Sequence, residues 1–162
     1  MIRDTVEADA EVLTALVNSV CRERRYLASI EGFSVEGTRE FIRAIRSAEG
    51  VHVVAVASDQ LMGWCDIARL PCEGMRHVGR LGMGVRKDHR AQGVGRQLLQ
   101  QAIARAFAGG LDRIELEVFA TNDRAIRLYE RLGFVLEGRK VAARKLAGMI
   151  EDLLLYAKRN SA

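Results

Sequence analysis

The sequence has little proline and cysteine and no long apolar run, and each of these shortages excludes a kind of structure. A single proline among 162 residues leaves no Pro-rich linker. The three cysteines, Cys21, Cys65 and Cys72, are too few and too irregularly spaced for a disulfide framework. No apolar run approaches the roughly 20 residues of a membrane-spanning helix, and Met1–Asp4 does not begin a secretory signal. We therefore expect a cytoplasmic protein without membrane attachment.

The rest of the composition is that of one folded domain. Hydrophobic residues make up 49% and charged residues 28% of the chain, enough for a packed core and a solvated surface. No repeat, low-complexity tract or change in composition divides the chain, so residues 1–162 are expected to form a single domain. The formal net charge of +4 is compatible with an anionic cofactor, an acidic protein or nucleic acid. Nucleic acid is disfavoured because no stretch combines basic with aromatic residues.

Apolar spacing predicts ten elements in the order α-α-β-β-β-α-β-α-β-β. The helices are expected at residues 8–20, around 41–45, at 94–107 and at 123–132, and the strands at 51–57, 61–69, 77–85, 114–119, 134–138 and 150–157. This order indicates an α/β chain, layered as in α+β proteins, with one mixed sheet and helices packed against it. Gly82 and Gly84 fall inside an expected strand, which indicates a bulge or a close approach to its backbone.

The stretch Leu81–Arg96 has the features of an anion-binding loop. An expected strand runs into a short basic turn and then into a helix that begins Gly93-Val94-Gly95. Free N–H groups and the helix dipole attract an anion there, and glycines let it approach closely. A glycine-containing turn without function gives the same pattern. A Walker loop is excluded because no Gly-Lys pair occurs, and a Rossmann fingerprint because Gly93-x-Gly95 lacks the third glycine.

Two motifs in this half of the chain resemble signatures of the GNAT superfamily of N-acetyltransferases. Arg90–Gly95 matches the pyrophosphate loop R/Q-x-x-G-x-G/A, and Asn122–Phe134 matches N-x-x-A-x-x-L-Y-x-x-x-G-F. The order of elements extends the resemblance over essentially the whole chain. The segment Arg113–Phe119 is similar to bacterial enzymes that acetylate small molecules and amino acids. The resemblance implies the acyl-CoA N-acyltransferase fold, a single, mostly antiparallel sheet with a splayed parallel strand pair and helices on both faces.

The resemblance also implies where acetyl-CoA, the co-substrate, binds. It is expected between the strands at 79–85 and 114–119, with its pyrophosphate on the helix start and its pantetheine arm on the strand backbone. The residues implied in cofactor binding are Met83, Gly84, Val85, Arg90, Gln92, Gly93, Val94, Gly95, Arg96 and Asn122. Asn122 is also suited to be the N-cap of the helix that follows it.

The catalytic groups implied by the resemblance are Tyr129 and Glu117. Direct attack of an amine on a thioester needs a base, donors to the oxyanion and an acid for the leaving thiolate. Tyr129 matches the family tyrosine that serves as the acid; simple packing is its alternative role. Glu117 matches a carboxylate base of related protein acetyltransferases, a role that suits a buried carboxylate with a raised pKa. Its alternative is an ion pair with Arg80 or Arg113.

The acceptor site is the part on which the sequence says least. Glu31, Asp66 and His77 are the candidates for binding the acceptor amine, each with an ordinary surface, capping or strand-end role as the alternative. His77 is also a candidate proton relay. A zinc site at Cys65, Cys72 and His77 is disfavoured because the spacing is wrong and a fourth ligand is missing, so no metal is expected.

Together these features predict an acetyl-CoA-dependent N-acetyltransferase that acts on a small primary amine such as that of an amino acid. Arg24 and Arg25 suit a substrate carboxylate and favour that acceptor. Two alternatives stay open: acetylation of a protein N-terminus or lysine, and a non-catalytic module that only binds acyl-CoA. The strand Leu153–Tyr156 fits either the core or the interface of a homodimer.

Overall fold

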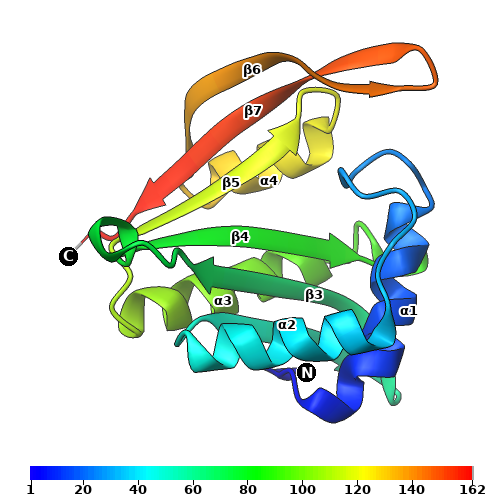
Figure 1. Cartoon of the computed structure of the whole chain (residues 1–162), viewed down its shortest axis with the longest axis vertical. Helices are drawn as coiled ribbons and strands as arrows, with labels where there is room; N and C mark the ends of the chain where they lie inside the picture. Colours follow the sequence, from blue (N-terminus) through cyan, green and yellow to red (C-terminus); the bar gives the residue numbers. More distant parts are fainter. Residues whose placement is uncertain (162) are drawn as a thin grey trace.

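The computed structural model describes residues 1–161 and shows one seven-stranded sheet with helices on both faces (Figure 1). The strands are β1 (Ile2–Asp4), β2 (Val51–Ala57), β3 (Gln60–Arg69), β4 (Val78–Val85), β5 (Arg113–Phe119), β6 (Val135–Leu146) and β7 (Met149–Arg159). The helices are α1 (Ala10–Cys21), α2 (Val35–Ser47), α3 (Val94–Ala108) and α4 (Asp123–Arg131). None of the helices in residues 1–161 is long and apolar enough to cross a membrane.

The sheet has the mixed topology that the sequence predicts. Its strand order is β1-β2-β3-β4-β5-β7-β6, and among these described strands β4 and β5 are the one parallel pair. The predicted fold class, a mostly antiparallel sheet with a splayed parallel pair and helices on both faces, is therefore confirmed.

Some element bounds differ from the sequence prediction, each for a local reason. β1 is missing from the predicted order because its three residues carry no pattern, and it forms by pairing with β2. The second helix begins at Val35, directly after the loop expected around 31–34, where the Ser34 hydroxyl caps it by accepting from the Gly37 N–H at 3.0 Å; it is longer than the sequence predicts. β6 and β7 are longer than predicted because they pair with each other beyond the end of β5.

β4 and β5 pair only where they begin. Val78–Arg80 pairs with Arg113–Glu115, and beyond these residues the two strands diverge (Figure 1). β3 holds the outer edge of β4, and β7 holds the outer edge of β5 along its whole length. In the described chain, the inner edges of both strands therefore take no sheet partner after the first three residues, and the sheet opens between them.

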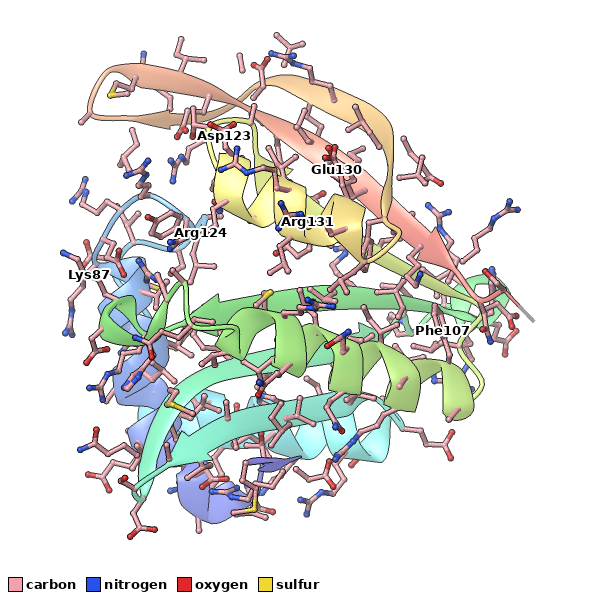
Figure 2. The ribbon with its side chains drawn as sticks, turned by 180° about the vertical axis from the view of Figure 1, so that it is seen from behind. Lys87, Phe107, Asp123, Arg124, Glu130 and Arg131 are labelled. Carbon is pink, nitrogen blue, oxygen red and sulfur yellow. The ribbon has the colours of Figure 1, made fainter. Side chains whose placement is uncertain are left out.

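The two faces of the sheet carry separate cores. α3 and α4 cover one face (Figure 2), where Cys65 and Leu81 are buried with Leu98 of α3. α1 and α2 cover the other face (Figure 1), where Trp64 is buried among residues of both helices. Because side chains alternate along a strand, Asp66 lies on the same face as Trp64 and opposite to Cys65. We call the two faces the α3 side and the α1 side.

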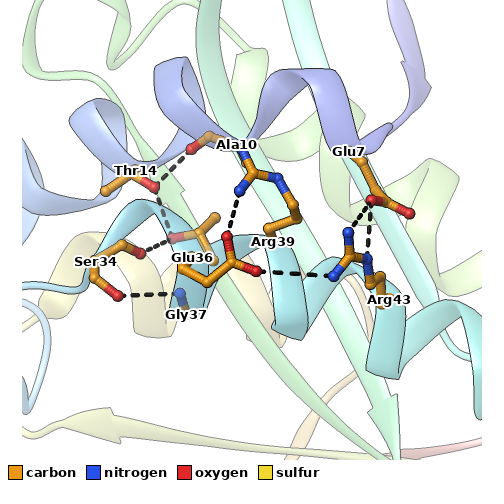
Figure 3. Close-up of polar contacts among 9 residues, drawn as sticks. Glu7, Ala10, Thr14, Ser34, Glu36, Gly37, Arg39 and Arg43 are labelled. Atoms are coloured by element: carbon orange, nitrogen blue, oxygen red, sulfur yellow. Dashed lines mark hydrogen bonds and ion pairs between the residues drawn. The ribbon is translucent and has the colours of Figure 1, made fainter.

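Polar contacts fix α1 against α2 (Figure 3). The hydroxyl oxygens of Thr14 and Thr38 lie 2.7 Å apart in a buried contact between the helices. At an exposed edge, Arg43 of α2 donates from Nε to a carboxyl oxygen of Glu7, in the short 3-10 turn that leads into α1, at 2.9 Å. The helix pair thus holds both ends of the connecting segment 22–34 in place.

Candidate active site

A cavity of about 1420 Å³ lies where β4 and β5 separate. Arg80–Val85 of β4 and Glu117–Phe119 of β5 line it. The α1–α2 connection, the start of α3, helix α4 and the β6–β7 hairpin contribute further residues. Because the strands part here, the lining includes residues from both the α3 side and the α1 side.

On the α3 side, the loop before α3 leaves backbone N–H groups available. Ala91 and Gly93 have positive φ angles of 61° and 84°, and Gly93 is the N-cap of α3. No side chain of the described residues caps this helix, and a side chain on Gly93 would meet nothing within 4 Å. A side chain on Gly95 would lie 3.4 Å from Met83, so this glycine brings the helix close to β4. Such an uncapped helix start, with its dipole, can bind a phosphate group.

Arginines on α4 face the same part of the cavity. Arg124, Arg127 and Arg131 are three and four residues apart, so they share one side of the helix, and all three line the cavity. Figure 2 shows Arg124 and Arg131 along α4, beside the gap that separates α4 from α3. Together with Arg96, they form no ion pair within residues 1–161. Their helical spacing is the sequence signal that identifies them, although solvated helices often carry the same pattern.

The side chains of Arg90 and Gln92, both expected to bind the cofactor, have other partners. Arg90 donates from Nε to the Val85 carbonyl at 2.8 Å, forms an ion pair with Glu23 and lies over the Tyr26 ring, 4.8 Å from its centre. The pKa of Glu23 lies below its usual value because of this pair. The Gln92 amide donates to a carbonyl of its own loop at 2.9 Å. Arg90 therefore ties the loop to the end of α1, and both residues offer an anion their backbone rather than their side chains.

Tyr129 and Asn122 both line the cavity. Tyr129 is buried and packs edge-on to Phe134, with the ring centres 5.8 Å apart. Burial raises the pKa of Tyr129 well above its usual value, so its hydroxyl stays protonated and can donate. Asn122 Oδ1 accepts from the Ala125 N–H at 3.3 Å and caps α4, as predicted. The cap uses the oxygen and leaves the amide nitrogen for the cavity.

Glu117 reaches the cavity from the α1 side, but it is not the buried carboxylate that would suit a base. Its side chain is 40% exposed, and its Oε1 lies 2.6 Å from Lys140 Nζ. The alternative partners named from the sequence are wrong, because Arg113 pairs with Glu115 at 2.8 Å and Arg80 forms no ion pair with a described residue. The partner of Glu117 depends on how the β6–β7 hairpin lies along β5, which local sequence does not show.

The buried carboxylate beside the cavity belongs to Asp66 of β3. It is 8% exposed and lies opposite Gly82 of β4 in the sheet register. A side chain on Gly82 would come within 2.8 Å of Asp66 Oδ2, so the carboxyl group lies directly over this glycine. Gly82 itself lines the cavity. Burial raises the pKa of Asp66 to about 7.

The other two residues expected to bind the acceptor, His77 and Glu31, lie away from the cavity. His77 precedes β4 at the closed end of the strand pair, is exposed, and accepts through its carbonyl from the Asp112 N–H at 2.9 Å. Glu31 is exposed in the α1–α2 connection, whereas residues 25–28 of that connection line the cavity. Residues 1–161 hold no cluster of three or more His, Cys, Asp or Glu side chains arranged for a metal ion.

Arg144 joins the β6–β7 hairpin to the α1–α2 connection across the α1 side. Its guanidinium lies 3.9 Å from the centre of the Phe119 ring and forms an ion pair with Glu151. It also donates to the carbonyls of Leu27 and Arg25 at 3.4 and 3.3 Å. These partners lie 117 and 119 residues away in the chain, so no local signal predicts the bridge. Arg144 therefore bounds the cavity on its α1 side.

This chain is similar to known proteins in both sequence and structure. The sequence profile of the acetyltransferase (GNAT) family matches residues 14–134. An L-methionine sulfoximine/L-methionine sulfone acetyltransferase from Pseudomonas paraeruginosa is 30% identical over 142 residues, which cover 85% of this chain and 81% of the relative. A GNAT-family acetyltransferase from Streptococcus pneumoniae has a TM-score of 0.93 and 28% identity, covering 99% of both chains. A GNAT phosphinothricin acetyltransferase from Sinorhizobium meliloti, solved with acetyl-CoA, shares the fold with a TM-score of 0.93 and 19% identity, covering 98% of this chain and 87% of that one.

The family match agrees with the geometry of the cavity. Both motifs, Arg90–Gly95 and Asn122–Phe134, lie inside the segment that the family profile matches. Both also contribute residues to the lining of the cavity between β4 and β5. The chain therefore belongs to the GNAT family and is an acetyl-CoA-dependent N-acetyltransferase.

Proposed function

We propose that this enzyme transfers the acetyl group of acetyl-CoA to the amino group of a small, amino-acid-like acceptor. The observation that carries this proposal is the cavity itself, which combines an anion site on the α3 side with carboxylate and arginine side chains on the α1 side. The Pseudomonas relative is named for methionine sulfoximine and methionine sulfone, two amino-acid derivatives, and supports an acceptor of this kind.

The α3 side fits acetyl-CoA. The N–H groups of residues 92–96 would donate to the pyrophosphate, and Arg124, Arg127 and Arg131 would balance the charge of the cofactor phosphates. The free inner edge of β4 at 83–85 offers backbone groups to the pantetheine arm, much as a strand offers them to a neighbouring strand. The open backbone at the loop lets the phosphates approach without a side chain in the way.

Tyr129 would protonate the departing thiolate. Attack of the amine on the thioester carbonyl forms a tetrahedral oxyanion, and its collapse releases the thiolate of CoA. The buried hydroxyl of Tyr129 gives its proton to the sulfur and regains one from the nitrogen of the adduct, so no tyrosinate accumulates. On the α1 side, Glu117 could accept the first amine proton only if its ion pair with Lys140 opens.

The α1 side suits an acceptor that carries a carboxylate close to its amine. Arg25, Arg80 and Lys145 line the cavity and form no ion pair within residues 1–161, so their charges are free for a carboxylate. The Arg144 bridge limits the room that an extended polypeptide would need. We therefore favour a small acceptor over a protein N-terminus or a lysine side chain.

Release of free thiol from acetyl-CoA, with mass spectrometry of the acetylated product, tests this function. The acceptor panel would contain free amino acids including methionine sulfone, polyamines without a carboxylate, and short peptides. We expect turnover with amino acids and little with polyamines or peptides. Turnover of peptides alone would contradict the proposed acceptor. Tight binding of acetyl-CoA without any turnover would favour a binding module, and no binding at all would contradict the whole proposal.

A further inference from the structure

Two side chains of β3 lie across the neighbouring strand β4. A side chain on Gly84 would come within 2.2 Å of the Trp64 indole, and one on Gly82 within 2.8 Å of Asp66 Oδ2. Both β3 side chains therefore extend over the β4 backbone, and they do so toward β5, because β4 separates β3 from β5 in the sheet. The two glycines, which both line the cavity, thus leave room for the side chains of Trp64 and Asp66 over the β4 backbone.

The carboxyl group of Asp66 is buried without a hydrogen-bond partner. Within residues 1–161 it accepts no hydrogen bond and forms no ion pair, although it is only 8% exposed. Both ring nitrogens of His52 lack a hydrogen-bond partner and are fully enclosed by protein. The two carboxyl oxygens of Asp66 also lack a partner, but they are not fully enclosed. The oxygens therefore keep contact with open space, and Gly82 beneath them lines the cavity. A buried carboxylate without a partner is costly, and beside a cavity such a group indicates function.

We propose that Asp66 is the base that takes the proton from the acceptor ammonium, a role that rests on the function proposed above. One proton moves from the ammonium nitrogen to the Asp66 carboxylate and later leaves to solvent. The neutral amine forms a C–N bond with the thioester carbonyl carbon, and the C–S bond breaks. The sulfur takes the hydroxyl proton of Tyr129, which regains a proton from the nitrogen. The products are the amide, the CoA thiol and one released proton.

The surroundings of Asp66 suit this role better than those of Glu117. A pKa of about 7 lets Asp66 accept a proton near neutral pH. The titratable groups next to it in the sheet, on the same face, are His52 from β2, whose pKa burial lowers to about 4, and Arg80 from β4. The buried residues of α1 and α2, which cover this face, include no acidic or basic side chain. Glu117, in contrast, is ion-paired and 40% exposed.

Kinetics of Asp66→Asn, with Glu117→Gln as the matched control, test the assignment. Each variant removes one carboxylate charge from the α1 side. With the amino acid found in the thiol-release assay, we expect Asp66→Asn to lower kcat/KM at pH 7 by about 100-fold or more, with an unchanged Kd for acetyl-CoA. Its rate should recover as the pH rises and free amine forms. Glu117→Gln should lose less than about tenfold and keep the enzyme ionisation near pH 7.

A rate of Asp66→Asn within about threefold of wild type, with the ionisation near pH 7 retained, would overturn the assignment. If thermal melting shows that this variant does not fold, the pH dependence of kcat/KM of the wild-type enzyme tests the assignment instead. An enzyme ionisation near pH 7 that stays in place for acceptors of different amine pKa supports Asp66, and its absence overturns the proposal. Wild-type protein that binds acetyl-CoA but acetylates no amine would contradict the proposed function itself.

Discussion

The two sides of the cavity are built in different ways. The α3 side depends on backbone: positive φ angles at Ala91 and Gly93, an uncapped start of α3 and the free edge of β4. These features come from one short stretch of sequence. The α1 side depends on side chains from separate segments, such as Glu117 of β5 and Arg144 of β6, which line the cavity, and Asp66 of β3, which lies over Gly82.

This difference separates two tasks within one reaction. A site made of backbone groups binds the same ligand as long as the loop keeps its conformation, which suits a cofactor. A site made of side chains changes with each substitution, which suits an acceptor that differs between enzymes. We therefore expect variants on the α3 side to affect acetyl-CoA, and variants on the α1 side to affect the acceptor.

The largest effect is expected from Gly93→Glu on the α3 side. Its φ of 84° strains any other residue, and the new carboxylate would repel the pyrophosphate. We expect acetyl-CoA to bind about 1000-fold more weakly by calorimetry, a loss of about 4 kcal/mol. Gly148→Glu is the control, because Gly148 also has a positive φ of 80° and open space around it but lies in the β6–β7 turn. Equal losses in both variants would break the assignment of the α3 side.

A large effect on turnover is expected from Tyr129→Phe, which removes the proposed acid. We expect kcat to fall about 100-fold while KM for both substrates changes little. Tyr156→Phe is the matched control, since it loses a hydroxyl that donates to Glu130 at 2.9 Å and does not line the cavity. Steady-state kinetics check both variants. An unchanged kcat in Tyr129→Phe would leave this tyrosine with a packing role only.

A smaller and more selective effect is expected from Arg144→Gln. Loss of the bridge should loosen the α1–α2 connection and raise KM for the acceptor by about tenfold, equivalent to about 1.4 kcal/mol. The Kd for acetyl-CoA should not change. Arg139→Gln is the control, because Arg139 pairs with Asp152 on the same hairpin without lining the cavity. A change in acetyl-CoA affinity instead would show that the two sides are not separable.

The smallest effect is a pH dependence of stability that belongs to Asp66. Its pKa rises from 3.8 to about 7 on folding, so between these values the folded protein holds a proton that the unfolded chain has released. Wild-type stability therefore falls as the pH rises through this window, by up to about 1.4 kcal/mol per unit, and Asp66→Asn lacks this loss. The difference in Tm between variant and wild type should widen by a few degrees per pH unit and then level off above pH 7. A constant difference would mean that folding does not raise the pKa of Asp66.

The fold and the α3 side were largely predictable because their signals are local. β2 occupies Val51–Ala57, as its β-branched residues predict. Gly109 and Gly110 follow directly on the end of α3, and the positive φ of Gly110 shows why glycine is needed there. Gly93 at the start of α3 is a local signal of the same kind, because its φ is also positive.

The α1 side was not predictable to the same depth because it depends on strand register and on distant contacts. The sequence singles out Asp66 only as one of three candidate acceptor residues. Its place over Gly82 follows from the β3–β4 pairing, and that pairing also explains the glycines of β4. The ion pair of Glu117 with Lys140 spans 23 residues and three strands, β5, β7 and β6, so the sequence predicted an ion pair for Glu117 but not its partner.

A crystal structure with acetyl-CoA and an unreactive analogue of the acceptor would test most directly whether the two sides meet at the thioester. We predict the pyrophosphate at the N–H groups of residues 92–96 and the sulfur next to the Tyr129 hydroxyl. The acceptor nitrogen should lie next to an Asp66 oxygen, across the thioester from Tyr129. Acetyl-CoA bound outside the gap between β4 and β5, or an acceptor nitrogen held by Glu117 with Asp66 out of reach, would contradict this arrangement.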